Sequence, residues 1–302
     1  LSDIEYGVGV YNVGVNQQTN VTTMVDVSGA GAFNDSQVYS NTNLDSDSSY
    51  VEYHSNWYLP SAMGEYINTF SVSADNTDDN PNNNNTEVKF SVTDSVFAPY
   101  HSFDIAGTVG TYFASDGFKA ANMVEMLTAD ELTSVSLVLH SSTVAGGFVQ
   151  ISVADTTGFL DDAATPFIYS EFYTITQADV DAGIVTIPIP TNYNGSAQDR
   201  NMGPGAFYVT VECYSNADAN PINLLDDKTY PYRTWYGSII HIPGEQWYSN
   251  GEALGIAANF GTWAYSEYWD CVNGSCIEVS GTGEFGSLEE CEQECVIVSS
   301  WN

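Results

Sequence analysis

The residues with the best-defined chemistry are four cysteines near the end of the 302-residue chain, Cys271, Cys276, Cys291 and Cys295. Cysteines at such spacings either bind a structural zinc ion or form disulfides. Because this segment is short, acidic and without histidine, two disulfides that hold it together are the favoured interpretation, and all three pairings stay open. The remaining cysteine, Cys213, is interpreted as a buried thiol within a strand, although it could instead pair with another chain.

A second candidate site is the acidic turn "SADNTDDNPNNNNTE", which lies between two strand-like stretches. Asp75, Asp78 and Asp79, together with neighbouring asparagine oxygens, could bind calcium, because this ion prefers carboxylate and amide ligands. Runs of Asn and Asp also form ordinary hairpin turns, since their side chains bond to their own backbone. The ordinary turn is the simpler interpretation, and calcium is the one cofactor that the sequence suggests.

A third group consists of aromatic residues in "TYPYRTWYGS" and "EQWYSN", namely Tyr232, Trp235, Tyr236, Trp247 and Tyr248. Exposed aromatic rings near carboxylates and amides are one way in which β-sandwich modules bind sugars. The same residues could instead contact another subunit, since Tyr and Trp are favoured at interfaces. A third interpretation is that they fill or cover the core of a sandwich.

Signatures of enzymes are missing from the sequence. It contains no G-x-S-x-G, no H-E-x-x-H, no phosphate-binding loop and no dinucleotide fingerprint. The four histidines lie far apart and are interpreted as structural residues. With 39 aspartates and glutamates, some pair of carboxylates always lies close together, so proximity alone identifies no glycosidase pair. We therefore predict no catalytic residue and no enzymatic activity, with a hydrolase as the least favoured alternative.

The charge of the chain excludes several partners. Its 39 acidic residues face only 5 lysines and arginines, for a formal net charge of −34. Such a surface repels phosphate backbones and anionic membranes, so we expect no nucleic-acid ligand. It either holds cations or keeps a secreted protein soluble, and the second interpretation is favoured. No apolar run is long enough for a transmembrane segment, and a start at Leu1 leads us to expect a processed chain.

The pattern of residues predicts an all-β protein made of tandem β-sandwiches. Short alternating stretches separated by Gly, Asn, Asp and Pro predict an immunoglobulin-like sandwich over residues 1–94. Seven or more further strands, among them "SEFYTITQADV", predict a larger, jelly-roll-like sandwich over residues 95–269. A cysteine-rich segment follows over residues 270–302. The only helical turn that we expect before this segment is in "VEMLTADELTS", which could also lead into a strand.

Several motifs support a resemblance to known families. "NVG" in the first strand, "GEYINTFSVSAD" and the turn "DNTDDNPNN" resemble the adhesion-related, CARDB-type immunoglobulin-like modules of large secreted bacterial proteins. The next module and the cysteine segment resemble domains exported by the type IX secretion system of Bacteroidetes-group bacteria. This resemblance implies O-glycosylation at Ser95 and Thr156, each of which follows an aspartate. Residues 299–302 resemble the start of another cysteine repeat, so we expect a longer precursor.

Together these observations predict a non-catalytic, secreted or cell-surface protein with a structural or adhesive role. Its sandwich edges could add a strand from a neighbouring copy and so assemble an extracellular fibre. The alternative is a carbohydrate-binding accessory region of a larger secreted hydrolase. The expected partners are thus further copies, other surface proteins or a polysaccharide.

Overall fold

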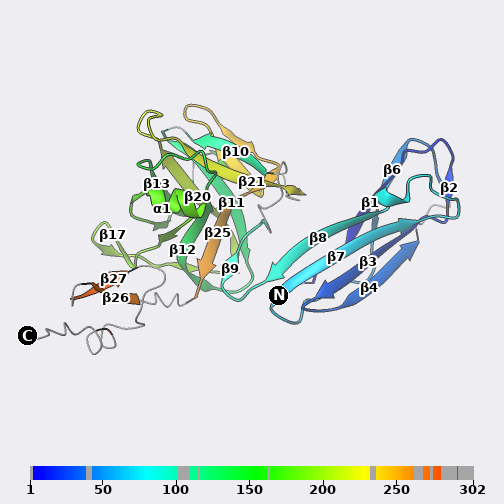
Figure 1. Ribbon diagram of the computed structural model, residues 1–302, viewed down its shortest axis with the longest axis horizontal. Helices are drawn as coiled ribbons and strands as arrows, with labels where there is room; N and C mark the ends of the chain where they lie inside the picture. Colours follow the sequence, from blue (N-terminus) through cyan, green and yellow to red (C-terminus); the bar gives the residue numbers. More distant parts are fainter. Residues whose placement is uncertain are drawn as a thin grey trace, which may run out of the picture. The chain divides into compact units, whose positions relative to one another are not determined.

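The computed structural model describes residues 3–38, 43–100, 109–114, 116–161, 164–231, 236–261, 268–272, 275–279 and 291. The prediction of an all-β fold is confirmed, because strands are the main regular structure of the described chain, beside the α-helix α1 and two short 3₁₀ helices (Figure 1). Two compact units, Leu1–Phe260 and Gly261–Asn302, make up the chain. No helix in the described part is both long and apolar enough to cross a membrane.

The first sandwich contains a four-stranded antiparallel sheet in the order β4-β3-β7-β8 and two strand pairs, β1-β6 and β2-β5. Its elements are β1 (Gly7–Asn12), β2 (Gln18–Thr19), β3 (Thr22–Gly29), β4 (Phe33–Val38), β5 (Asn43–Leu44), β6 (Ser48–Tyr53), β7 (Gly64–Ser73), the 3₁₀ helix η1 (Pro81–Asn83) and β8 (Asn85–Val92). In β3 every second residue is buried, namely Thr23, Val25 and Val27. This alternation directs one face of the strand into the core.

Aromatic rings fill the core of this sandwich, around Val25 and Val27. Tyr66 stacks on Phe90 with ring centroids 4.9 Å apart, and its hydroxyl donates to the carbonyl of Ala62 at 2.7 Å. Large rings therefore provide the apolar area that a small sandwich needs, while each buried phenol can keep a polar partner. The acidic segment predicted as a turn does connect two strands, β7 and β8.

The second set of sheets contains most of the remaining strands. A seven-stranded sheet joins β14-β13-β20-β11-β22-β23, with β15 also on β13, and a five-stranded sheet joins β16-β12-β25-β9, with β19 on β12. Their bounds are β9 (Val96–Phe97), β11 (Phe118–Met126), β12 (Asp130–Val138), β13 (Phe148–Asp155), β14 (Ile168–Tyr169), β15 (Tyr173–Thr174), β16 (Ile184–Pro188), β19 (Asn201–Met202), β20 (Gly205–Tyr214), β22 (Ser238–His241), β23 (Trp247–Ser249) and β25 (Ile256–Phe260).

Three smaller groups complete the strands. A three-stranded sheet has the order β10-β21-β24, and two hairpins pair β17 with β18 and β26 with β27. Their bounds are β10 (Val109–Ala114), β17 (Asn192–Tyr193), β18 (Ser196–Ala197), β21 (Ile222–Pro231), β24 (Glu252–Leu254), β26 (Tyr268–Val272) and β27 (Ser275–Val279), and the second 3₁₀ helix is η2 (Phe159–Asp161). No sheet in the described ranges combines strands of residues 3–92 with strands of residues 96–260. The predicted domain boundaries after residues 94 and 269 stay predictions.

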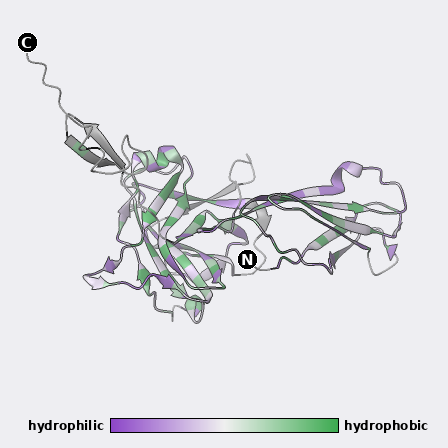
Figure 2. Cartoon of the chain, turned by 90° about the horizontal axis from the view of Figure 1, so that it is seen from below, coloured by the Kyte–Doolittle hydropathy of each residue, from purple (hydrophilic) through white to green (hydrophobic). Residues whose placement is uncertain are grey.

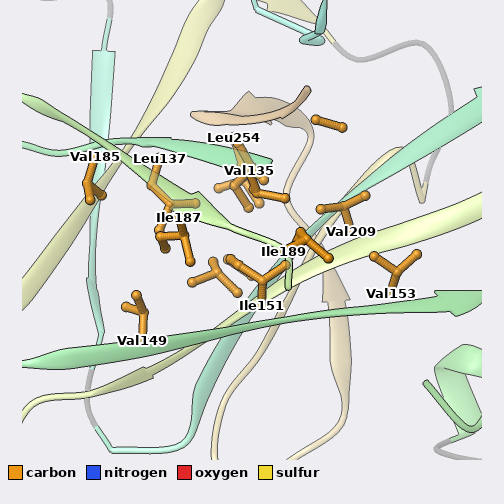
Figure 3. Packing of buried hydrophobic residues seen from close by; sticks show 14 of the residues in the cluster. Val135, Leu137, Val149, Ile151, Val153, Val185, Ile187, Ile189, Val209 and Leu254 are labelled. Atoms are coloured by element: carbon orange, nitrogen blue, oxygen red, sulfur yellow. The ribbon is translucent and has the colours of Figure 1, made fainter. Parts of the chain in front are cut away.

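Branched aliphatic side chains form the core of the second sandwich. Val135 and Leu137 of β12, Ile151 of β13 and Ile187 of β16 are all nearly inaccessible to solvent and interdigitate (Figure 3). Strand β20 is buried on both faces, because a second cluster around Tyr208 covers its other side. Figure 2 shows hydrophobic and hydrophilic residues interspersed along the strands, as expected where one face of a strand is buried and the other is not.

Two expectations about local structure were wrong. Residues 177–180, expected at the end of the strand "SEFYTITQADV", belong instead to helix α1 (Gln177–Ala182). Thr176 and Asp179 make a capping box and Gly183 ends the helix in a left-handed conformation, so end-capping outweighs the β-propensity of the preceding residues. The helical turn expected in residues 124–134 does not form, and the alternative that this segment leads into a strand is confirmed, because it ends β11 and begins β12, each paired with partner strands.

The cysteine segment contains a disulfide between Cys276 and Cys291, which is one of the bonds that the sequence left open. Cys276 lies on β27 opposite Cys271 of β26 in the strand register. Cys295 and residues 299–302 lie outside the described residues. The interpretation of Cys213 as a buried free thiol is confirmed, and burial, followed by the charge of Glu212, raises the pKa of this thiol.

We predict that Ile187→Ala lowers the free energy of unfolding by about 2–5 kcal/mol, because it leaves a cavity in the core. Ile184→Ala on the same strand is the matched control, since Ile187 is 1% exposed and Ile184 is 46% exposed. The control should stay within about 0.5 kcal/mol of the wild type. Urea unfolding followed by tryptophan fluorescence measures both, and equal effects would contradict the assigned core.

Peptide mapping without reduction should recover Cys276 linked to Cys291. Only one of the three pairings contains this bond, and it joins Cys271 to Cys295, so that second linked peptide is expected as well. Iodoacetamide should modify Cys213 only after denaturation, because the thiol is buried and its thiolate disfavoured. A peptide that links Cys271 to Cys276 would show this assignment to be wrong.

Candidate functional site

The first sandwich carries a pocket of about 320 Å³, formed by two segments that are distant in sequence. One segment comprises the end of β1 and the loop after it, residues 9–16, and the other comprises the end of β7 and the following loop, residues 72–84. Gln18, Val21 and Leu44 complete the wall. This volume lies at the lower end of the range for small-molecule sites.

The wall of the pocket is rich in amide groups. Its polar side chains belong to Asn12, Asn16, Gln18, Ser73, Asn76, Thr77, Asp78, Asp79, Asn80, Asn83 and Asn84. Among the lining residues there is no lysine, arginine, histidine or cysteine. Val13 and Val15 add largely exposed apolar surface. Amides both donate and accept hydrogen bonds, so the wall can bind neutral polar ligands, but it lacks a nucleophile paired with a base.

Asn12 fixes one side of the pocket. Its side chain is buried, and Nδ2 donates to the carbonyls of Asn16 at 2.9 Å and Leu44 at 3.1 Å. Its Oδ1 accepts from the backbone N–H of Gly14 at 3.0 Å. These bonds hold the loop after β1 in one arrangement, because a buried amide without partners would be costly.

Asp75 and its neighbours fix the opposite side. Oδ2 of Asp75 accepts from Thr19 Oγ1 at 2.9 Å and from Asn20 Nδ2 at 2.6 Å. Asn76 Nδ2 donates to the carbonyl of Gln17 at 3.0 Å. The loop after β7 is therefore tied to the residues around β2.

The residues predicted to bind calcium have separate roles. Asp75 ties the loop, Asp78 lines the pocket and accepts from the backbone N–H of Asn80 at 2.7 Å, and Asp79 lines the pocket. The described residues contain no group of three or more His, Cys, Asp or Glu side chains arranged to hold a metal ion. The structure therefore does not bring these three aspartates together as ligands.

One buried cluster resembles the hydroxyl, imidazole and carboxylate series of hydrolases. His54 Nδ1 lies 2.9 Å from Asp35 Oδ2, and His54 Nε2 lies 3.2 Å from Thr23 Oγ1. Thr23 is 0% exposed, His54 is 1% exposed, and the Thr23 hydroxyl also donates to the carbonyl of Gln37 at 3.3 Å. No substrate atom can reach this hydroxyl in the folded state, so the cluster joins β3, β4 and the end of β6 as a structural contact.

The predicted aromatic group is only partly described. Trp247 packs against Phe159 and His241, with ring centroids 4.8 and 5.2 Å apart, and belongs to the edge of a core. Tyr248 is exposed and donates to Glu245 at 2.7 Å, and Tyr236 is 51% exposed. Tyr232 and Trp235 lie outside the described residues, so contact of this group with a ligand or subunit stays a prediction.

The two predicted O-glycosylation sites lie at turns next to strands. Ser95 Oγ donates to Asp94 at 3.1 Å, and the carbonyl of Ser95 accepts from the backbone N–H of Phe260 at 2.6 Å. Thr156 is partly buried, and its backbone N–H donates to the carbonyl of Ala206 at 3.3 Å. Modification at either residue stays a prediction.

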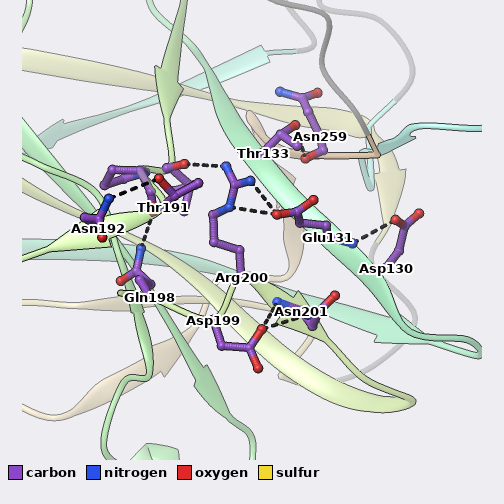
Figure 4. A network of polar contacts seen from close by, with 12 residues as sticks. Asp130, Glu131, Thr133, Thr191, Asn192, Gln198, Asp199, Arg200, Asn201 and Asn259 are labelled. Carbon is purple, nitrogen blue, oxygen red and sulfur yellow. Dashed lines mark hydrogen bonds and ion pairs between the residues drawn. The ribbon is translucent and has the colours of Figure 1, made fainter. Parts of the chain in front are cut away.

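Arg200 connects three segments of the second sandwich (Figure 4). Its Nε donates to Glu131 Oε1 at 3.1 Å, Nη2 makes a second contact with the same oxygen, and Nη1 donates to the carbonyl of Ile189 at 2.9 Å. The nearby Gln198 also bonds to the carbonyl of Pro190 at 3.0 Å. These polar groups form their hydrogen bonds with one another, so this network is structural.

Most residues of the pocket could not be identified from local sequence patterns. Asp78 and Asp79 were identified for their carboxylates, whereas Asn16, Gln18 and Asn83 were not, because neither segment forms a wall alone. Proximity of two loops depends on strand pairing across the sandwich, which local patterns do not specify. The density of asparagine in the loop after β7 was the only local indication.

We predict that the Asp35 carboxylate makes the stability of the first sandwich pH-dependent. Burial alone would raise the pKa of Asp35, but hydrogen bonds from Asn56 and His54 and the charge of His54 outweigh it and lower the pKa below 3.8. The resulting stabilisation is present above the unfolded pKa of about 4 and is lost as the pH falls through the folded pKa.

Urea midpoints measured between about pH 5 and pH 2 should therefore fall less steeply for Asp35→Asn than for the wild type. Asp26→Asn, on an exposed position of β3, serves as the control and should follow the wild type. Parallel curves for Asp35→Asn and the wild type would contradict the role of this carboxylate.

Comparison with known proteins gives little further information. No known protein family and no curated protein matches the chain. It is similar to a clostridial cysteine protease, Cwp84, after propeptide cleavage, with 11% identity and a TM-score of 0.39 over 81% of this chain and 66% of that one. It is also similar to the cysteine protease and lectin-like domains of Cwp84, a surface layer associated protein of Clostridium difficile, with 10% identity and a TM-score of 0.34 over 81% and 59%. The chain covers less than two thirds of either structure, and at these scores neither supports a conclusion about function.

Proposed function

We propose that the chain is a non-catalytic secreted protein of the cell surface that adheres to neutral polysaccharide through the pocket of its first sandwich. The observation that carries this proposal is the wall of the pocket, in which amides and two carboxylates surround about 320 Å³ without a basic side chain. Such a wall matches a ligand with many hydroxyl groups, because amides can donate to and accept from each hydroxyl.

Electrostatics favours a neutral ligand. Asp78 and Asp79 line the pocket, and the whole chain has a formal net charge of −34. Both the local and the distant charges therefore repel sulfated or carboxylated polymers and phosphate groups. A neutral sugar avoids this repulsion, and its hydroxyls can donate to the carboxylates.

Separate observations support the non-catalytic role and the extracellular location in this proposal. The hydroxyl–imidazole–carboxylate cluster at Thr23, His54 and Asp35 is closed to substrate, which supports a binding role. The Cys276–Cys291 disulfide supports export, because disulfides persist in oxidising compartments. The resemblance of the sequence to exported modular proteins supports the same location. A carbohydrate-binding accessory region of a larger secreted hydrolase would use the same pocket.

Assembly into an extracellular fibre is a second proposal. It is supported by the sheet β4-β3-β7-β8, in which β4 and β8 are the outer strands within the described residues. An outer strand can pair with a strand of another copy. The charge of −34 on each copy opposes such contacts, so assembly would have to be promoted by high salt or cations.

We predict that the purified chain is retained on at least one neutral polysaccharide among cellulose, chitin, starch, xylan, mannan and β-1,3-glucan. The double variant Asn80→Ala and Asn83→Ala should weaken this retention by about tenfold or more, since each lost hydrogen bond is worth roughly 1 kcal/mol. Asn85→Ala is the matched control, because Asn85 is exposed on the adjacent β8 but does not line the pocket.

Pull-down on insoluble polymers and affinity electrophoresis in soluble ones measure the retention. Retention on none of the six polymers would reject the proposal. So would a double variant that binds as well as the control.

A further inference from the structure

The outward face of the β1–β6 pair carries an unusual set of residues. In the strand register Gly7 lies opposite Tyr53, and Gly9 lies opposite Val51. Tyr11 follows at the end of β1, two residues beyond Gly9 and on the same face. Tyr11, Val51 and Tyr53 are 54%, 56% and 61% exposed, so the pair presents two aromatic rings and a valine to solvent.

Two glycines of β1, Gly7 and Gly9, leave the backbone between these side chains uncovered by side chains of their own. A Cβ atom on Gly7 would lie 2.9 Å from Cε1 and 3.1 Å from Cδ1 of Tyr53, so the ring of Tyr53 lies over Gly7. A Cβ atom on Gly9 would have no neighbour within 4 Å. The strip between the two tyrosines is therefore open down to the backbone, and Tyr53 can present one side of its ring to a ligand.

This face is continuous with the pocket. Gly9 and Tyr11 belong both to the face and to the wall of the pocket. The hydroxyl of Tyr11 hydrogen-bonds to Asp47, and this bond raises the pKa of the phenol, which stays neutral and held in place. A ligand that enters the pocket beside Tyr11 can thus continue along the strip toward Tyr53.

The length of the strip indicates the size of the ligand. Tyr11 follows Gly7, which lies under Tyr53, by four positions in β1, and this corresponds to about 13 Å along the strand. A single sugar ring cannot span that distance, whereas a short linear oligosaccharide can. The apolar faces of its rings would stack on the tyrosines, while its hydroxyls reach the amides of the pocket.

We propose that the β1–β6 face and the pocket together form one extended site for a linear neutral polysaccharide, in which Tyr53 stacks on a sugar ring beyond the pocket. The proposal rests on the binding function proposed above and adds a requirement for chain length. A second copy of the chain is a poorer occupant, because each copy has a net charge of −34.

Isothermal titration with di- and hexasaccharides tests this proposal, using cellobiose and cellohexaose, chitobiose and chitohexaose, and the corresponding pairs from starch, xylan, mannan and β-1,3-glucan. For the sugar that binds, the hexasaccharide should bind wild type at least tenfold more tightly than the disaccharide. Tyr53→Ala should remove most of this difference and leave the affinity for the disaccharide unchanged, whereas Tyr53→Phe should behave as wild type.

Two further variants exclude a loss of folding as the cause. Gly9→Ala adds a Cβ atom to the strip at a point with no other atom within 4 Å and should also weaken hexasaccharide binding, while the thermal unfolding midpoint does not fall. Phe172→Ala removes a comparably exposed ring from the second sandwich and should leave binding unchanged.

Equal affinity of wild type for both chain lengths would overturn the extended site. Wild-type affinity of Tyr53→Ala for the hexasaccharide would do the same. In either case the pocket function would stand if Asn80→Ala with Asn83→Ala still weakens binding. If no saccharide binds at all, both proposals fail.

Discussion

The fold depends on how the chain accommodates its carboxylates. With 39 acidic and 5 basic residues, ion pairs can neutralise only a few of them, and the rest repel one another in a compact state. Local hydrogen bonds, instead of ion pairs with basic side chains, stabilise some of these carboxylates. Backbone N–H groups of Ala217 and Ser215 donate to Asp116 at 2.9 and 2.5 Å and outweigh burial, so the pKa of this carboxyl is lowered. Its charged form is thus favoured by the turn that it stabilises.

The same arrangement recurs at other turns and builds the candidate site. Asp179 closes the capping box of α1, and Asp75 ties the loop after β7 to β2. A carboxylate that already accepts hydrogen bonds from neighbouring residues is less able to serve as a metal ligand, so acidic composition alone does not identify a calcium site. Asp226 of β21 departs from the pattern, because it is 2% exposed and its Oδ1 has no hydrogen-bond partner within the described part of the chain.

The sequence predicted those features that depend on neighbouring residues. Alternation in β3 and the Asn- and Asp-rich turn after β7 both follow from local chemistry, and both were found. Helix α1 was missed although its capping residues are local, because β-branched neighbours suggested a strand. Trp247 could not be assigned from sequence, since its packing against Phe159 depends on the pairing of distant strands. The pocket was missed for the same reason, because its two walls are brought together only by the sandwich.

Accessibility, rather than residue type, distinguishes the two polar clusters of the first sandwich. Thr23, His54 and Asp35 have the residue types of a hydrolase, but the hydroxyl is buried and already bonded, so it can neither meet a substrate nor release its proton to one. The pocket has the opposite character, because its amides face an open cavity and none of them is a nucleophile. The exposed amides beside Tyr11 and Tyr53 are the groups that the proposed binding of a polymer would use. Since many weak stacking and hydrogen-bonding contacts along one polymer add up, such a site can adhere firmly without any single strong interaction.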